Sequence, residues 1–193
     1  MSHTPKILAF AGSAREGSYN KKLVKIAAAG AQKAGAEVTL IDLRDYPLPV
    51  YDMDLEAKEG LPENARKLKA LFKEHDGFLI SSPEHNGLFS TMIKNVVDWA
   101  SRQEEGEKSL ECFVGKFAGL VATSPGALGG LRGLPHLRSL LMGIHTQVIT
   151  NQVAVPGAGK AFNGDGSMTD EKLSARVEKV GADLAETIRK MKA

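Results

Sequence analysis

The sequence has a single cysteine, Cys112, among its 193 residues. One cysteine cannot form a disulfide within the chain, and it offers no second thiol for a metal site or a redox pair. A lone cysteine in such a chain is most simply a small buried hydrophobic residue. The sequence therefore predicts no disulfide and no metal site, and it favours a structural Cys112 over a catalytic thiol.

Long apolar runs and a strong excess of charge are also missing. No run approaches the roughly 18 apolar residues of a membrane-spanning helix, and residues 1–5 lack the basic and apolar regions of a secretion signal. The formal net charge is only +2, and no cluster of Lys and Arg is interleaved with aromatic residues. We therefore expect a cytoplasmic protein that binds neither membrane nor nucleic acid.

The composition is that of a globular protein, with 42% hydrophobic and 25% charged residues. The length suits one well-buried domain and is short for two, so we predict a single domain over residues 1–193. Strand and helix patterns alternate, which is typical of βαβ units around a parallel sheet. Strands are predicted near residues 6–11, 37–42, 77–82, 116–123 and 145–149, and the longer helices near 21–34, 62–75, 90–101, 131–142 and 170–191.

The turn after the first strand carries the clearest chemical signal. Gly12 and the residues after it lead into a helix whose first amides have no partner inside the helix. These amides and the helix dipole favour an anion. Ser13, Ser18 and Asn20 add neutral hydrogen-bonding groups, and Arg15 adds a planar cation suited to phosphate. The turn is thus expected to bind a phosphate ester, although Gly and Ser also occur in such turns merely to form the turn.

The residues that this turn lacks narrow down the kind of phosphate. Gly12 and Gly17 are spaced like the glycines of a Walker A loop, but Ser18-Tyr19 follows in place of Lys and Ser or Thr, which argues against a nucleoside triphosphate. Ala14 breaks the G-x-G-x-x-G pattern, so a tightly held pyrophosphate is not supported. Asp42, which could otherwise bind a ribose, is then more simply a polar strand end. A terminal monophosphate fits best.

Two further loops follow the third and fourth predicted strands. Pro83–Gly87 and Ser124–Gly130 each contain Gly and Pro and come where open parallel sheets bind their ligands. Loops gathered at one edge of a sheet imply one extended ligand. Trp99, on the apolar helix after the second loop, is expected to serve packing or an interface rather than chemistry.

These three loops together resemble the signatures of the NAD(P)H-dependent FMN reductases. The matching patterns are Gly12-Ser13-x-Arg15-x-x-Ser18-x-Asn20, then Pro83-Glu84-x-Asn86-Gly87 with Lys94-Asn95-x-x-Asp98-Trp99, and Ser124-Pro125-Gly126-x-x-Gly129-Gly130. Three motifs in this order after three successive strands are far more specific than any one alone. The resemblance spans about residues 6–142. It implies a flavodoxin-like α/β fold, a doubly wound sheet of five parallel strands in the order 2-1-3-4-5 with helices on both faces.

The resemblance also implies an oxidoreductase that binds FMN. NADPH or NADH would supply hydride, and electrons would pass in a ping-pong cycle to a small acceptor such as a quinone, free flavin, azo compound or a metal oxyanion such as chromate. Because the flavin carries the chemistry, we predict no catalytic side chain. The implied cofactor-binding residues are Ser13, Arg15, Ser18, Tyr19 and Asn20 in the first loop, Pro83, Glu84, His85, Asn86 and Gly87 in the second, and Ser124, Pro125, Gly126 and Gly129 in the third.

The chain departs from the family pattern at two positions. His85 stands where the family usually has tyrosine, and Ser90 where it usually has proline. The His85 side chain could border the place where nicotinamide and acceptor alternate, or it could turn inward to cap a carbonyl. Acceptor preference therefore cannot be carried over from any family member.

Two readings without enzymatic turnover stay open at this point, a flavodoxin-type electron carrier and a flavin-sensing regulatory protein. Electron carriers of this fold are typically strongly acidic, whereas this chain is slightly basic, which favours the enzyme. We also expect a homodimer or a dimer of dimers, built around the helix with Trp99 and the loop from Tyr46 to Met53.

Overall fold

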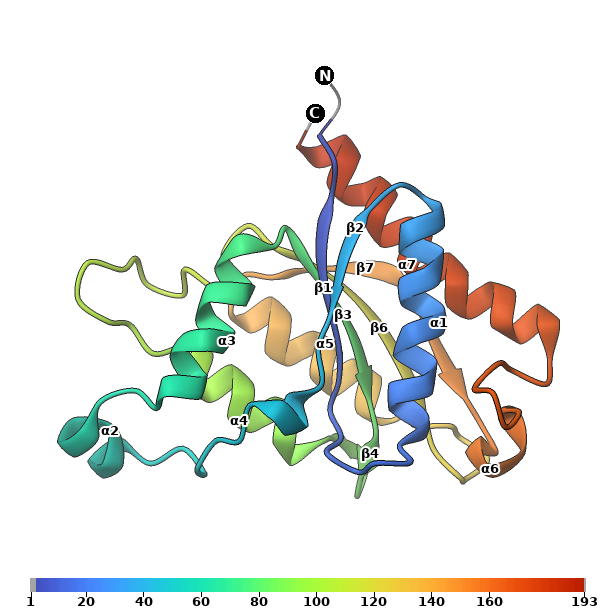
Figure 1. Cartoon of the computed structure of the whole chain (residues 1–193), viewed down its shortest axis with the longest axis horizontal. Coiled ribbons are helices and arrows are strands. Elements are labelled where there is room, and N and C mark those ends of the chain that lie inside the picture. Colours follow the sequence, from blue (N-terminus) through green and yellow to red (C-terminus); the bar gives the residue numbers. More distant parts are fainter. Residues whose placement is uncertain (1–2, 193) are drawn as a thin grey trace.

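Five parallel strands form the central sheet of the computed structural model, which describes residues 3–192 (Figure 1). The sheet order is β2-β1-β3-β6-β7. When only the five strands of this sheet are numbered, the order reads 2-1-3-4-5, which confirms the predicted flavodoxin-like order. The strands are β1 (Lys6–Ala11), β2 (Glu37–Leu40), β3 (Gly77–Ser82), β6 (Phe117–Thr123) and β7 (Gln147–Val155).

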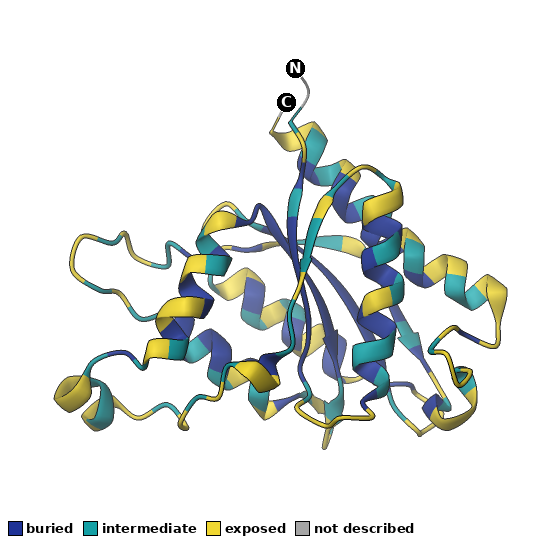
Figure 2. Ribbon diagram, in the orientation of Figure 1, coloured by how far each residue is buried: buried dark blue, intermediate teal, exposed yellow. Residues whose placement is uncertain are grey.

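Helices cover both faces of this sheet, which explains why β3 and β6 are buried along their whole length (Figure 2). One hydrophobic core joins the sheet to α1 (Tyr19–Lys33) and α7 (Glu171–Met191). The other joins it to α3 (Glu63–Glu74), α4 (Thr91–Ala100) and α5 (Gly133–Gly143). The carboxyl ends of β1, β3 and β6 therefore emerge between two helical layers at one edge.

Two glycines let α1 and α7 lie against each other. A Cβ atom on Gly30 would stand 2.0 Å from the Glu178 carbonyl oxygen, and one on Gly181 would stand 1.9 Å from the Ala27 carbonyl oxygen. No side chain fits into such spaces, so the helix backbones touch directly. This contact fixes α1, and with it the turn that precedes α1.

The structure differs from the sequence-based expectation in its short elements. A 3₁₀ turn, η1 (Leu43–Asp45), and a helix, α2 (Met53–Glu59), lie at the two ends of the segment from Tyr46 to Met53, where we expected only a loop. The α2 helix begins there because Asp52 accepts hydrogen bonds from the amides of Asp54 and Leu55 at 2.7 and 3.1 Å. A further short helix, α6 (Ala158–Ala161), lies between β7 and α7, where no helix was predicted.

The predicted end of the last strand at residue 149 is wrong, since β7 continues to Val155. The second half of β7 contains polar residues, and two of them find partners on neighbouring helices. Asn151 donates to Asp183 at 2.9 Å, and Gln152 accepts from Arg138 at 3.1 Å. An edge strand tolerates polar side chains that are satisfied in this way.

The Trp99 ring packs inside its own chain. Its side chain is completely buried, and its Nε1 donates to the Pro49 carbonyl at 2.8 Å. Asn95 donates to the same carbonyl at 2.8 Å and accepts from the Tyr51 amide at 2.8 Å. Of the two roles expected for Trp99, packing or an interface, its buried ring has the packing role, and through it α4 holds the loop of residues 46–51.

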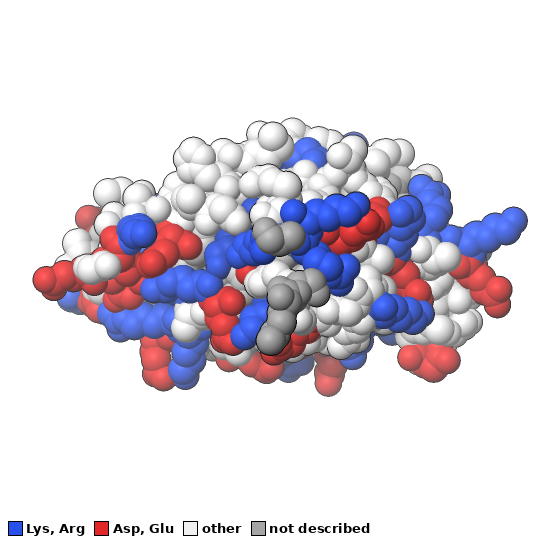
Figure 3. Space-filling model, turned by 90° about the horizontal axis from the view of Figure 1, so that it is seen from above, with Lys and Arg blue, Asp and Glu red and all other residues white. Residues whose placement is uncertain are grey.

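The face formed by the start of β1 and the end of α7 lies opposite the edge at which the three loops meet (Figure 1). Viewed from that side, Lys and Arg side chains are interspersed with Asp and Glu (Figure 3). No helix within residues 3–192 is long and apolar enough to cross a membrane.

Candidate functional site

A cavity of about 470 Å³ lies at the carboxyl ends of β1, β3 and β6. Its size falls within the range of small-molecule sites, which is about 300–1,000 Å³. The lining residues are Gly12, Ser13, Ala14, Arg15, Ser18, Tyr19, Asn20, Pro83, Glu84, His85, Thr91, Met92, Thr123, Ser124 and Pro125. All three predicted loops thus face one space.

Most of the predicted binding residues line this cavity, and four do not. Asn86, Gly87, Gly126 and Gly129 are absent from its wall. Gly129 has a positive φ of 60°, and a Cβ atom there would stand 2.4 Å from the Val155 backbone, so packing requires this glycine. Conversely, Thr91 and Met92 line the cavity although no motif pointed to them. The only signal for them is their position at the start of the helix that follows the second loop.

The first turn presents hydrogen-bond donors that the rest of the protein leaves available. Ser18 is the N-cap residue of α1, but its side chain makes no capping hydrogen bond. In contrast, Ser90 caps α4 through a 3.3 Å bond from the Ile93 amide. The Arg15 guanidinium is exposed, lies 5.8 Å from the Tyr19 ring centre, and has no ion pair within residues 3–192. An uncapped helix start beside an unpaired arginine fits a phosphate monoester.

Asn20 stabilises this turn through buried hydrogen bonds rather than through an exposed side chain. Its side chain is buried, with its Oδ1 accepting from Ser81 Oγ at 2.8 Å and from the Thr123 amide at 3.1 Å. Its Nδ2 donates to the Thr123 carbonyl at 3.0 Å. One amide side chain thereby ties the start of α1 to the ends of β3 and β6, and so holds the three loops in register.

The second loop is a small hairpin of β4 (Glu84–His85) and β5 (Leu88–Phe89). Asn86 and Gly87 form its two-residue turn with φ values of 53° and 86°, the left-handed pair that a type I′ turn requires. This conformation explains why an Asn-Gly pair stands there.

A link between loops holds this hairpin in place. The Glu84 carboxylate accepts from Arg132 Nε at 2.8 Å and from the Arg132 backbone amide at 3.2 Å. The second loop is thus joined to the start of α5, directly after the third loop. Arg132 is a positioning residue that the motifs did not reveal, since its partner is 48 positions away.

His85 projects from this hairpin with an exposed side chain. It makes no hydrogen bond within residues 3–192, so the structure gives no support to the alternative in which it caps a carbonyl. Its place on the cavity wall leaves it accessible to whatever enters the cavity.

Ser90 makes two bonds that a proline could not make. Its amide donates to Ser82 Oγ at 3.2 Å, and its own hydroxyl caps α4. A Cβ atom on Gly12 would stand 2.4 Å from Ser90 Oγ, so the first turn packs directly against this cap.

The cysteine lies outside the cavity and is suited to packing. Burial raises the pKa of the Cys112 thiol to about 11, so little thiolate exists near neutral pH. Within the described residues, no group of three or more His, Cys, Asp and Glu side chains could hold a metal ion.

Comparison with known proteins decides the family. The family model described as NADPH-dependent FMN reductase matches residues 5–160. The chain belongs to the NADPH-dependent FMN reductase family. This confirms the predicted oxidoreductase with FMN as its cofactor and NADPH or NADH as its hydride donor.

Individual members of this reductase family are similar over most of the chain. An NAD(P)H-dependent FMN reductase of Pseudomonas aeruginosa is 30% identical over 193 residues and covers 100% of both chains. A quinone reductase of Escherichia coli K12 is 31% identical over 153 residues, which cover 77% of this chain and 76% of the relative. The solved structure of FerB, a flavoenzyme NAD(P)H:(acceptor) oxidoreductase from Paracoccus denitrificans, superposes with a TM-score of 0.81 at 29% identity, covering 97% of this chain and 98% of that one.

Proposed function

We propose that this reductase binds FMN in the cavity of about 470 Å³ and reduces a small acceptor with electrons from NADPH or NADH in a ping-pong cycle. The observation that carries the assignment of the site is the uncapped start of α1 beside the unpaired Arg15. A phosphate at one end of a long ligand is the group that such a turn receives best.

The chain's own residues divide the work of holding the cofactor. Ser13, Ser18, Arg15 and the first amides of α1 hold the phosphate, and the second and third loops flank the rest of the ligand. Bound FMN supplies the redox chemistry, accepting hydride and releasing electrons. The protein's part is to orient the ring and leave one face open, which is why no side chain is assigned as a catalytic acid, base or nucleophile.

The acceptor class is proposed from the relatives and from the open wall of the cavity. Quinone reductases are among the similar proteins, which supports a quinone as the first acceptor to assay. Free flavin, azo compounds and metal oxyanions such as chromate follow as further candidates. His85 stands exposed on the wall that such molecules would approach.

Three further properties belong to the same proposal. Residues 1–193 act as a single FMN-binding domain in the cytoplasm, and the protein forms a homodimer or a dimer of dimers. Val50 and Met53 support an interface at the loop held by α4, because their side chains are 84% and 73% exposed. Light scattering at micromolar concentration measures the assembly, and a fully active monomer would disprove it.

Arg15→Ala tests the phosphate assignment. Losing a charge-assisted contact of about 1.5–3 kcal/mol should weaken FMN at least tenfold and leave riboflavin, which has no phosphate, nearly unchanged. Titration of the apoprotein by flavin fluorescence measures both affinities. Arg176→Ala, an exposed arginine on α7, is the matched control. Equal losses for FMN and riboflavin would show that Arg15 does not contact the phosphate.

A further inference from the structure

A smaller cavity of about 270 Å³ lies between α4 and the segment of residues 43–48. Apolar side chains make up most of its wall, among them Leu43, Leu48, Met92 and Val96. An apolar cavity of about 150 Å³ is already large enough to bind a benzene molecule. This cavity can therefore hold an apolar group larger than a benzene ring.

Three polar residues also line this cavity, Arg44, Tyr46 and Asn95. The Asn95 amide already bonds to the backbone of Pro49 and Tyr51, at 2.8 Å each. Arg44 is exposed, so its guanidinium can stay in water while its methylene groups cover the cavity. Tyr46 packs its half-buried ring against the core. An apolar group can thus enter the cavity without displacing these polar groups from their surroundings.

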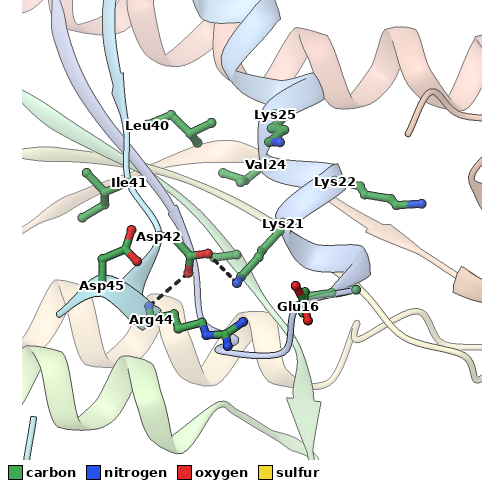
Figure 4. A pocket seen from close by; sticks show the side chains of 13 residues that line it. Glu16, Lys21, Lys22, Val24, Lys25, Leu40, Ile41, Asp42, Arg44 and Asp45 are labelled. Carbon is green, nitrogen blue, oxygen red and sulfur yellow. Dashed lines mark hydrogen bonds and ion pairs between the residues drawn. The ribbon is translucent and has the colours of Figure 1, made fainter. Parts of the chain in front are cut away.

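The wall formed by residues 43–48 is held at both ends. Asp42, directly before η1, accepts from Lys21 Nζ at 2.5 Å and from the Arg44 amide at 3.0 Å, which ties η1 to α1 (Figure 4). At the other end, two side chains of α4 donate to the Pro49 carbonyl. The cavity is therefore a feature of the fold rather than of a free loop.

Met92 separates this cavity from the proposed FMN site. Met92 and Ala14 line both cavities, so these two residues form their common wall. Ala14 has only a methyl group, whereas Met92 is half-buried near the start of α4 and has an unbranched side chain with three rotatable bonds. Such a side chain can turn aside for a ligand without a change in the backbone. Access from one cavity to the other therefore depends on the conformation of Met92.

A third cavity, also of about 470 Å³, contains Thr91 and Met92 in its wall as well. Lys94 and Asp98 border that cavity, and their Nζ and Oδ2 atoms form an ion pair at 2.7 Å. An apolar group placed there would compete with the hydration of this ion pair. Of the two cavities that Met92 borders beside the FMN site, the one of about 270 Å³ is therefore the better place for an apolar group.

We propose that Met92 determines acceptor specificity by turning aside to admit an apolar ring substituent of a quinone into the cavity of about 270 Å³. The proposal rests on the proposed function, because the quinone ring must lie beside FMN in the neighbouring cavity. It narrows the acceptor class from quinones in general to quinones that carry an alkyl group on the ring.

Steady-state kinetics with 2-methyl- and 2-butyl-1,4-benzoquinone tests the proposal, because the two rings are electronically alike. In the wild-type holoenzyme, kcat/KM for the butyl compound should exceed that for the methyl compound at least about tenfold, since three more methylene groups are buried. Leu48→Phe, which fills the cavity from its far wall, should abolish this preference and leave the methyl compound unchanged. Leu40→Phe on β2, outside both cavities, is the matched control and should keep the preference.

Met92→Ala tests the common wall itself. Without the thioether, the bulkier 2-tert-butyl-1,4-benzoquinone should gain at least about fivefold in kcat/KM relative to the butyl compound. A wild-type preference below twofold, or equal changes for methyl and butyl compounds in Leu48→Phe, would overturn the proposal. Altered selectivity in Met92→Ala with none in Leu48→Phe would place the substituent in the cavity beside Lys94 and Asp98, and would also overturn it.

A binding measurement separates this site from the flavin chemistry. In NMR spectra of the oxidised holoenzyme with ¹³C-labelled methionine methyl groups, the signal that Met92→Ala removes should shift on titration with butylbenzene, which is redox-inert. Leu48→Phe should weaken this binding at least about tenfold. An unshifted Met92 signal would show that repacking or a second copy closes the cavity, and would overturn the proposal. If butylbenzene binds in this way but the enzyme reduces no quinone with NADPH or NADH, the proposed function fails while the apolar site stands.

Discussion

Replacing Asn20 by alanine should lower stability and FMN affinity together, because one buried amide holds all three ligand loops. The variant removes three hydrogen bonds, which join Asn20 to Ser81 Oγ and to the amide and carbonyl of Thr123. At about 1 kcal/mol net for each hydrogen bond, the free energy of unfolding should fall by about 3 kcal/mol. Ser81 and Thr123 are fully buried, so polar groups left without partners add to this loss rather than reduce it.

Urea unfolding of the apoprotein, followed by circular dichroism, measures the stability without contribution from bound flavin. In thermal scans the same loss corresponds to a decrease in Tm of about 6–12 °C, at about 2–4 °C per kcal/mol for a chain of this size. Asn151→Ala is a matched control, because that amide makes one bond to Asp183 far from the loops. This variant should lower the free energy of unfolding by about 1 kcal/mol and leave the FMN affinity unchanged.

Two results would refute this reasoning. If Asn20→Ala loses no more stability than the Asn151→Ala control, then water or repacking replaces the hydrogen bonds of Asn20. A full stability loss with normal FMN affinity would show that the network holds the fold but does not position the phosphate turn.

Three other variants test separate parts of the structure. His85→Tyr and His85→Ala should keep near-normal FMN content but change the ratio of reoxidation rates by anionic and neutral acceptors, and lost FMN with an unchanged ratio would assign His85 to the scaffold. Gly181→Ala should destabilise the protein by about 1–3 kcal/mol, because the added methyl group would collide with the backbone of α1. An unchanged free energy of unfolding in urea would contradict direct contact of α1 and α7. Burial raises the pKa of Glu107, but hydrogen bonds from Lys69 and Lys73 outweigh this effect and lower the pKa from 4.5 to about 2. The wild type should therefore be more stable than Glu107→Gln by a constant amount above about pH 5, and this difference should shrink as the pH falls toward 2. A difference that is constant across this range would disprove the ion-pair contribution.

The sequence predicted the parts of the fold that local pattern controls. The buried strands read as apolar runs, and their alternation with helices predicted the parallel sheet and the long helices, whereas the strand order was expected only from the family resemblance. The phosphate turn was also predictable, because Gly, Ser and Arg at a strand–helix junction have a local chemical meaning. The Asn86-Gly87 pair carried a hairpin signal that the loop interpretation overlooked.

Features that depend on distant partners were not predictable in this way. The link between Glu84 and Arg132 joins residues far apart in sequence, and the extension of β7 depends on Asp183 and Arg138. Asn20 was predicted at the site, but its role beneath the turn depends on two strands that only the folded sheet brings close. The local sequence shows which polar groups are present, whereas the folded sheet determines which of them remain without a hydrogen-bond partner.

Trp99 gives the protein a built-in optical probe. It is the only tryptophan in the chain, it is fully buried, and it donates to the backbone of the loop of residues 46–51. Residues of that loop line the 270 Å³ cavity, which shares Ala14 and Met92 with the wall of the flavin cavity. Any ligand that lifts this loop must expose the indole to water and shift its emission to longer wavelength, so binding of such a ligand can be followed in the unlabelled protein without introducing a reporter.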